Sequence, residues 1–199
     1  MSLEMFDLFL NYMNSGGLVM WSLLLCALFL WYSLGYRFHT LNRGSRKSIR
    51  NLIRKFKSGK RKESKGIMDS AIMDAMNEYY VGAKPRTNRS YMDDVFYSYS
   101  VEINRYSRLI KTLVMIAPLI GLLGTVIGMI ETFDSLASMS LFSQSGGIAG
   151  GISQALFTTQ LGLVVAVPGV IMGRLLDRRA STMELELEQI KDILCSEGV

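Results

Sequence analysis

Long apolar runs interrupt a chain that is otherwise polar and basic. They are Leu18–Tyr36, Leu113–Ile130 and Ala155–Gly173. Each is close to the ~20 residues that a helix needs to cross ~30 Å of hydrocarbon, and nothing in the pattern indicates a β-sheet. We therefore predict an all-α integral membrane protein with long helices that extend into a helical cytoplasmic region. Its three transmembrane helices are expected at residues 18–38, 112–133 and 150–174.

The positions of Lys and Arg predict how these helices are oriented. All 22 lie in two blocks, Arg37–Lys111 and Arg174–Lys191, and basic residues gather on the cytoplasmic side of a membrane. We expect the cytoplasmic segments to be 39–111 and 175–199, and the outer ones to be 1–17 and 134–149. The first run follows acids rather than Lys or Arg and lacks a small-residue cleavage site, so we expect a retained span rather than a signal peptide.

The cytoplasmic region has a helical pattern. Ile49, Leu52, Ile53 and Phe56 recur at helical spacing among basic residues, which predicts an amphipathic helix at the membrane surface or on a partner helix. Such basic clusters beside spans usually meet anionic lipid rather than nucleic acid. A second amphipathic helix is expected over Ile67–Tyr80, and one uninterrupted helix over Tyr91–Phe133. The third span is expected to continue as a helix towards the C-terminus.

The third span contains more polar side chains than membrane packing needs. Gln154, Thr158, Thr159 and Gln160 lie in or just before its first turns. A Thr hydroxyl can bond back to a carbonyl of its own helix, which explains one of them but explains four together less well. Because polar groups facing hydrocarbon are costly, we expect them to face protein or a wet path. Gly124 and Gly128 of the second span form a GxxxG, a weak signal for close helix packing.

Ionisable side chains are missing from the middle of every predicted span. Glu131 and Asp134 lie at the outer end of the second span. Hydroxyls and amides can order water but do not titrate, so a proton relay would need a carboxylate from a partner. Cys26 and Cys195 are expected at different depths, so we expect no disulfide between them. No catalytic motif, metal-ligand cluster or cofactor motif is present, so we expect neither an enzyme nor a bound cofactor or metal.

Two stretches, "APLIGLLGTVIGMIETF" (Ala117–Phe133) and "GGISQALFTTQLGLVVAVPG" (Gly150–Gly169), resemble the signature helices of the MotA/TolQ/ExbB proton-channel family. The three-span layout is most similar to its ExbB and TolQ branch. The resemblance implies a pentamer in the bacterial inner membrane, with a periplasmic N-terminus and a cytoplasmic C-terminus. Two helices of an ExbD-like partner would sit in the pore and bring an Asp each. Proton flow would then drive work on a TonB-like protein for nutrient import across the outer membrane.

The same resemblance assigns individual residues. Thr125 and Thr159 match the family's threonines of the second and third spans, and Thr158 and Gln154 are expected to help them line the pore. Gln154 stands where some members have Glu, so only hydrogen bonding is expected there, and Arg174 also departs from the family pattern. The residues expected in helix packing are Pro118, Gly121, Gly124, Gly128, Gly162 and Pro168. Two alternatives stay open, a TolQ-like motor subunit for envelope integrity and a passive membrane scaffold.

Overall fold

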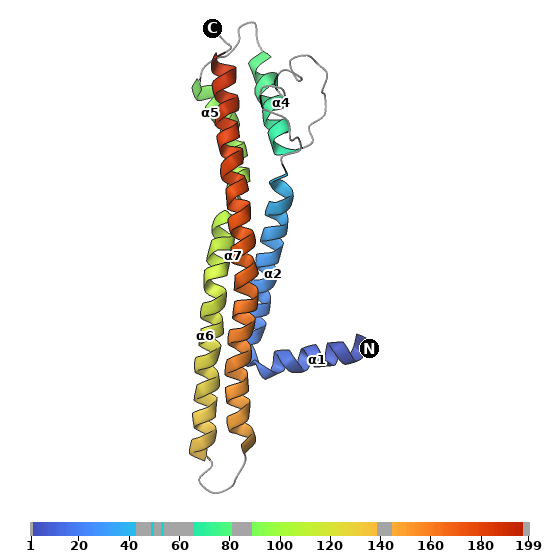
Figure 1. Ribbon diagram of the computed structural model, residues 1–199, viewed down its shortest axis with the longest axis vertical. Coiled ribbons are helices and arrows are strands. Elements are labelled where there is room, and N and C mark those ends of the chain that lie inside the picture. The colour runs from blue at the N-terminus through green and yellow to red at the C-terminus, as the bar shows by residue number, and fades with distance from the viewer. Residues whose placement is uncertain are drawn as a thin grey trace. The chain divides into compact units, whose positions relative to one another are not determined.

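The computed structural model of the chain describes residues 2–42, 49, 53, 66–80, 89–138 and 145–196. All regular structure in these ranges is helical, which confirms the all-α prediction (Figure 1). The helices are α1 (Ser2–Ser15), α2 (Gly17–Thr40), α4 (Ile67–Tyr80), α5 (Arg89–Asn104), α6 (Ser107–Ser138) and α7 (Ser145–Ser196).

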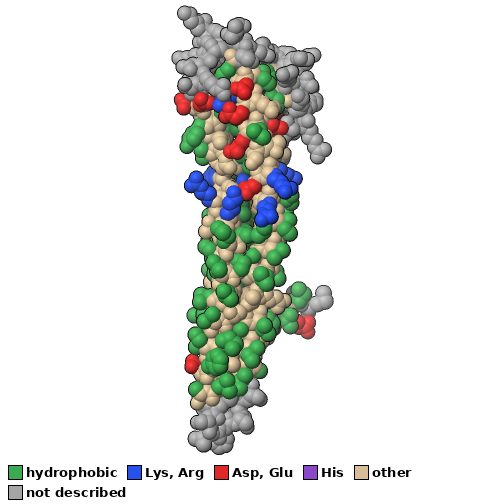
Figure 2. Space-filling model, turned by 60° about the vertical axis from the view of Figure 1, so that its left-hand side comes forward, with side chains coloured by type: hydrophobic (Ala, Val, Ile, Leu, Met, Phe, Trp, Pro, Cys, Tyr) green, Lys and Arg blue, Asp and Glu red, His purple; other side chains and the backbone are tan. Residues whose placement is uncertain are grey.

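Three helical stretches are long and apolar enough to cross a membrane, as the sequence predicts. They are Gly17–Thr40, Met92–Ala137 and Ile148–Cys195, and their apolar windows lie mostly at the surface of the chain. Hydrophobic side chains such as Leu119, Leu156 and Leu163 are more than half exposed, and Figure 2 shows how densely such side chains cover the surface. A surface of this kind is expected where lipid rather than water surrounds the helices.

The chain divides into two compact units. Unit 1 comprises Met1–Leu34 and Leu109–Gly173, and unit 2 comprises Gly35–Arg108 and Arg174–Val199. Within unit 1, α6 and α7 pack against each other in opposite directions, because Gly128 lies beside Ala155 while Gly121 lies beside Thr158 and Gly162. The α2 helix packs on this pair: a Cβ on Gly169 would stand 2.8 Å from Leu30 Cδ2.

In unit 1, α1 runs across the direction of α2 rather than along it (Figure 1). The two helices meet at Gly16 and Gly17, and Gly17 has a φ of 63°. Only glycine adopts this left-handed conformation without strain. A side chain at Gly17 would also approach the Gln154 amide nitrogen to 3.0 Å. The sequence did not predict α1, because residues 1–17 were expected only to lie outside the membrane.

In unit 2, α4 packs against α5. The hydroxyl of Tyr99 donates a hydrogen bond to Asp74, and burial together with this bond raises the pKa of Tyr99 above its ordinary value. The α4 bounds agree with the predicted amphipathic helix. The basic amphipathic helix predicted before it falls largely outside the described residues, although Ile49 and Ile53 are helical and Ile53 is buried.

The single helix predicted over Tyr91–Phe133 is interrupted. A turn at Arg105–Tyr106 separates α5 from α6, and Tyr106 has a φ of 62°. Contacts within unit 2 account for the interruption. The Tyr106 ring packs edge-on to Tyr36 at 5.1 Å, and the Arg105 guanidinium lies over both rings. No glycine or proline marks this turn, so sequence spacing alone gives no signal for it.

Candidate functional site

Small residues let α6 and α7 approach until their backbones touch. A Cβ added to Gly121 would stand 3.0 Å from the Thr158 carbonyl oxygen, and one added to Gly162 would stand 3.0 Å from the Ala117 carbonyl oxygen. At Gly128 it would stand 2.6 Å from the Gly151 oxygen. Glycines at such crossings allow close packing in lipid. The structure thus places Gly121, Gly128 and Gly162 at this contact, while Pro118 and Pro168 lie inside α6 and α7 and are half-buried.

Thr158 lies inside the contact between the two helices. Its side chain is completely buried and faces Gly124, where an added Cβ would stand 2.5 Å from Thr158 Cβ. The hydroxyl donates to the carbonyl oxygens of Gln154 and Ala155 at 3.1 and 3.0 Å. The hydroxyl is therefore used within its own helix, and within this chain it does not line an open surface.

Thr125 and Thr159 share one edge of the α6–α7 pair, which we name the threonine edge. Each follows a contact residue, Gly124 on α6 and Thr158 on α7, and one residue turns a helix by about 100°. Because α6 and α7 are antiparallel, the residues that follow the contact on both helices emerge on the same side. Both side chains are half-exposed. Their hydroxyls donate to the carbonyl oxygens of Leu122 and Ala155, at 2.6 and 3.0 Å. The lone pairs of each hydroxyl oxygen can still accept a hydrogen bond.

The threonine edge is otherwise apolar. Moving along each helix by three, four or seven residues from its threonine keeps to the same stripe. On α6 this stripe contains Leu122, Thr125, Met129 and Leu136; on α7 it contains Ile152, Leu156, Thr159, Leu163 and Val170. All the apolar members are exposed within this chain. Thr132, seven residues along α6 from Thr125, is buried, and its hydroxyl donates to the Gly128 carbonyl oxygen. Each stripe therefore exposes a single hydroxyl in a hydrophobic surface.

Glu131 and Gln154 lie on the opposite edge of the pair. The Gln154 amide donates to the Glu131 carboxylate at 3.2 Å. Glu131 and Leu113 are five helical turns apart and so share one face of α6, and the Leu113 carbonyl oxygen accepts a contact from Cys26 of α2 at 3.8 Å. This edge is the one that α2 covers, and Gln154 also abuts Gly17. Sequence reasoning placed Gln154 with the threonines and did not pair it with Glu131.

Unit 2 holds a charged group that the sequence analysis missed. Arg37 is only 2% exposed and its Nη1 donates to Asp177 Oδ1 at 2.6 Å. Ser107 at the start of α6 donates to the same oxygen at 3.0 Å. One residue from each of α2, α6 and α7 meets here, so the group fixes the register of three helices. In the sequence, Arg37 and Asp177 each follow a long apolar run, but only the folded structure shows that they pair.

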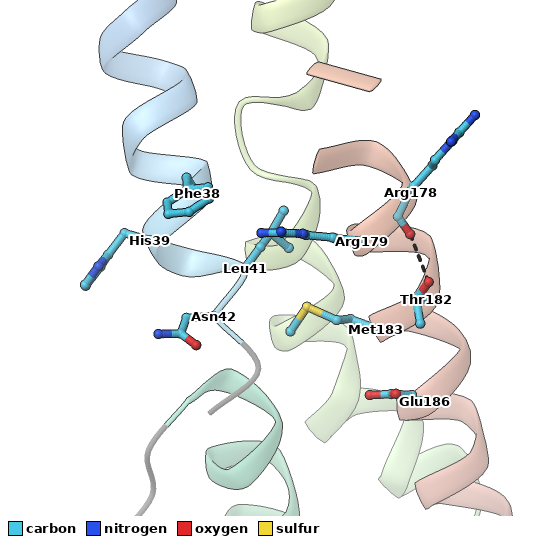
Figure 3. Close-up of a pocket in the computed structure, with 9 residues that line it drawn as sticks. All are labelled: Phe38, His39, Leu41, Asn42, Arg178, Arg179, Thr182, Met183 and Glu186. Atoms are coloured by element: carbon cyan, nitrogen blue, oxygen red, sulfur yellow. Dashed lines mark hydrogen bonds between the residues drawn. The ribbon is translucent and has the colours of Figure 1, made fainter. Parts of the chain in front are cut away.

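A cavity of about 570 Å³ lies in unit 2 between the end of α2 and α7. Figure 3 shows Arg179 extending from α7 towards α2, and its guanidinium lies 5.6 Å from the centre of the Phe38 ring. Leu41, Met183 and Glu186 complete that side. The lining combines a stacked cation, apolar side chains and an acid, and it has no nucleophile–base pairing. No metal-binding cluster of His, Cys, Asp or Glu occurs among the described residues.

Comparison with known proteins gives a consistent result. The profile of the MotA/TolQ/ExbB proton channel family matches residues 63–189, more than half of the chain. Putative biopolymer transport protein ExbB-like 3 from Synechocystis sp. is 34% identical over 87 residues, 43% of this chain and 41% of that protein. Biopolymer transport protein exbB1 from Vibrio cholerae is 38% identical over 87 residues, 44% of this chain and 38% of that protein.

Biopolymer transport protein ExbB from Aquifex aeolicus is 35% identical over 89 residues, 45% of this chain and 60% of that protein. The chain thus spans less than two thirds of the length of each of these three relatives.

Proposed function

Because the chain belongs to the MotA/TolQ/ExbB proton channel family, we propose that it is an ExbB-like subunit of a proton-driven motor. The motor lies in the bacterial inner membrane and couples the proton gradient to mechanical work. Apolar windows in three helical stretches support a multi-pass membrane protein. The ExbB names of the Synechocystis, Vibrio and Aquifex relatives favour the ExbB branch over the TolQ branch.

The observation that best supports this function is the threonine edge. Among the stripe residues named above, Thr125 and Thr159 present the only exposed hydroxyl groups, and the other exposed members are apolar. A hydroxyl that already donates to its own helix can still accept from water, so the two threonines can hold water in an otherwise hydrophobic passage. The α2 helix packs on the other edge, which leaves the threonine edge free for the pore.

The threonines conduct but do not store the proton. Hydroxyl groups do not titrate in the physiological range, so the titrating group must come from a partner. We assign it to carboxylates of an ExbD-like protein whose two helices would lie against the threonine edges of a ring of subunits, a pentamer in our proposal. A proton would pass from water held by Thr125 and Thr159 to that carboxylate, and on release to the cytoplasm the carboxylate would become charged again.

The remaining parts of the motor follow from the same assignment. The basic blocks support a topology with residues 39–111 and 175–199 in the cytoplasm and with the N-terminus and the 134–149 loop in the periplasm. A TonB-like protein would receive the work and energise nutrient import through the outer membrane. In this scheme Thr158 and the glycines of the α6–α7 contact hold the pore wall together, and Gln154 bonds to Glu131 on the edge covered by α2.

Co-expression with an ExbD-like protein from the same genome tests the proposal. We expect a stable complex whose reconstitution into liposomes gives proton flux driven by a pH gradient, measured with an entrapped pH-sensitive dye. Liposomes that contain this chain alone are expected to stay proton-tight, because the titrating carboxylate is missing. Purification of a lone monomer, without any partner helices, would overturn the proposal, and so would equal flux with and without the partner. A passive scaffold predicts a complex with no flux.

A further inference from the structure

The N-terminal helix α1 has a polar side and an apolar side. At about 100° per residue, its acids and amides fall on one side, and they are Glu4, Asp7, Asn11 and Asn14. Met5, Phe6, Phe9, Tyr12 and Met13 fall on the other side, and Leu8 and Leu10 lie at the two borders between the sides. A helix of this kind in water needs a surface to cover its apolar side.

Unit 1 covers only the C-terminal end of that apolar side. Met13 is buried, at 1% exposed, and the Tyr12 ring packs edge-on to Phe157 of α7 at 5.1 Å. The side chains one and two helical turns before Tyr12 and Met13 are not covered by unit 1. Phe9 is 43% exposed, Phe6 58% and Met5 68%. The apolar side of α1 is therefore covered near Tyr12 and Met13, while its large apolar side chains nearer the N-terminus are exposed.

The depth of the contact with α7 indicates what lies beneath the uncovered part. Phe157 belongs to the apolar run of α7, three residues further in than Gln154, which bonds to Glu131 at the outer end of the pair. The apolar side of α1 thus meets α7 at a level where hydrocarbon surrounds the bundle. Leu18, the second residue of α2, is 89% exposed, so the first span also begins with an exposed apolar side chain.

The turn at Gly16–Gly17 sets the direction of α1. Because Gly17 has a positive φ and abuts Gln154, the chain turns sharply within a single residue and α1 leaves across the direction of α2 (Figure 1). A helix joined in this way to the end of a span lies along the membrane surface. Its acids then point to water, and its phenylalanines point to the acyl chains, as in interfacial amphipathic helices.

We propose that α1 is an interfacial anchor whose apolar side, from Met5 to Phe9, is buried in the outer leaflet of the bilayer. The occupant of this surface is lipid and not a second copy of the chain. The acids on its polar side favour the outer surface, since the anionic cytoplasmic leaflet would repel them. The inference concerns a lipid contact and does not depend on proton transport.

Site-specific fluorescence in the reconstituted full-length protein tests this. In a Cys26→Ser/Cys195→Ser background, single cysteines replace Phe6 or Phe9 on the apolar side and Asp7 or Asn11 on the polar side. Each carries an environment-sensitive label. We expect lipids brominated near the headgroup end of their chains to quench the labels at 6 and 9 but not those at 7 and 11. Aqueous iodide is expected to quench the labels at 7 and 11 but not those at 6 and 9.

Two other outcomes would overturn the inference. Iodide quenching at all four positions would mean that α1 stands in water. Protection of positions 6 and 9 from both quenchers would mean that protein covers them, which assigns the surface to a second copy. A matched pair of charge variants adds a second readout. Phe9→Asp is expected to abolish lipid quenching of the label at position 6, whereas Asn11→Asp on the polar side is expected to leave it unchanged.

Discussion

Thr158 fills the notch that Gly124 leaves on the facing helix. A Cβ on Gly124 would stand 2.5 Å from Thr158 Cβ and 2.7 Å from its Cγ2, and Thr158 is completely buried. Distances this short mean that the two helices are spaced by this pair. The threonine edge depends on the pair as well, because Thr125 and Thr159 are the next residues along their helices.

Replacing Gly124 with Ala is therefore expected to push α6 and α7 apart. Overpacking of a tight contact costs about 1–3 kcal/mol, which would appear as a lower midpoint of thermal unfolding in detergent. The matched control is Gly150→Ala, since nothing lies within 4 Å of a Cβ at Gly150, and this change is expected to be neutral or slightly stabilising. Adding Thr158→Gly to Gly124→Ala should recover part of the loss. Equal behaviour of the two alanine variants would mean that the notch does not set the helix spacing.

Adjacent threonines provide the sharpest test of the pore wall. Thr159→Val and Thr125→Val keep the side-chain shape but remove the hydroxyl from the threonine edge. We expect each to lower proton flux in the partner-containing liposomes by about tenfold or more, which corresponds to roughly 1.4 kcal/mol on the barrier. Assembly with the partner should persist. Thr158→Val is the control, because its hydroxyl bonds only within α7, and its flux should stay near that of the parent. A larger loss in Thr158→Val than in Thr159→Val would reverse the assignment.

Apolar length and periodicity predicted much of the fold. The three spans, the Ile67–Tyr80 helix and the continuation of the third span as α7 all follow from local pattern. Membrane helices are easy to predict because lipid forces every backbone group to bond within its own segment. The turn at Tyr106 was missed because it is set by ring contacts with Tyr36 from another helix.

The candidate site was harder to predict than the fold. Periodicity separates Thr158 and Thr159 by about 100° around α7, but it does not say which of them faces α6. That choice depends on Gly124, a residue distant in sequence. Gln154 likewise looked like a neighbour of the threonines until its hydrogen bond to Glu131 placed it on the other edge. Pairings between helices are the information that one sequence lacks.

The positive φ of Tyr106, between α5 and α6, leads us to expect that a glycine variant is more stable than an alanine variant. A non-glycine residue in this conformation is strained by about 1–2 kcal/mol, and the ring contacts of Tyr106 offset that strain. Tyr106→Ala keeps the strain and loses the ring, whereas Tyr106→Gly loses the ring but also the strain. We expect Tyr106→Gly to be more stable than Tyr106→Ala by about 1 kcal/mol in thermal unfolding. If the alanine variant is the more stable one, then the turn does not keep its positive φ.

We expect the contribution of Lys191 to the free energy of unfolding to stay constant across neutral pH. Its ammonium donates to Asp93 at 2.7 Å and to Glu188 at 2.8 Å, and these bonds raise the pKa of Lys191 above its ordinary value of 10.5. A raised pKa stabilises the fold at pH values below the ordinary value and loses its effect as the pH rises through the raised one. Lys191→Met should therefore cost about 1 kcal/mol equally at about pH 6 and about pH 9. A cost that disappears by pH 9 would contradict this, and Asp93→Asn and Glu188→Gln should each cost less.

The ion pair of Arg37 and Asp177 predicts an asymmetry between its two partners. Arg37 is 2% exposed and its Nε and Nη2 are buried without hydrogen-bond partners, whereas the Asp177 side chain is 30% exposed. Removing the carboxylate with Asp177→Asn leaves a buried cation without its counter-charge, which we expect to cost about 2–4 kcal/mol. Arg37→Met removes the buried charge itself, and the remaining Asp177 can use water and Ser107, so this cost should be smaller.

A double-mutant cycle separates the charge from the packing. If the loss in Asp177→Asn comes from the stranded Arg37 cation, then Arg37→Met/Asp177→Asn should be more stable than Asp177→Asn alone, since the double variant strands no charge. The measurement is thermal unfolding in detergent, followed by the fluorescence of Trp21 and Trp31. Ser107→Ala provides the scale, because it removes only the 3.0 Å hydrogen bond to Asp177 Oδ1 and should cost about 1 kcal/mol. Strictly additive losses would mean that Arg37 and Asp177 do not act as a pair.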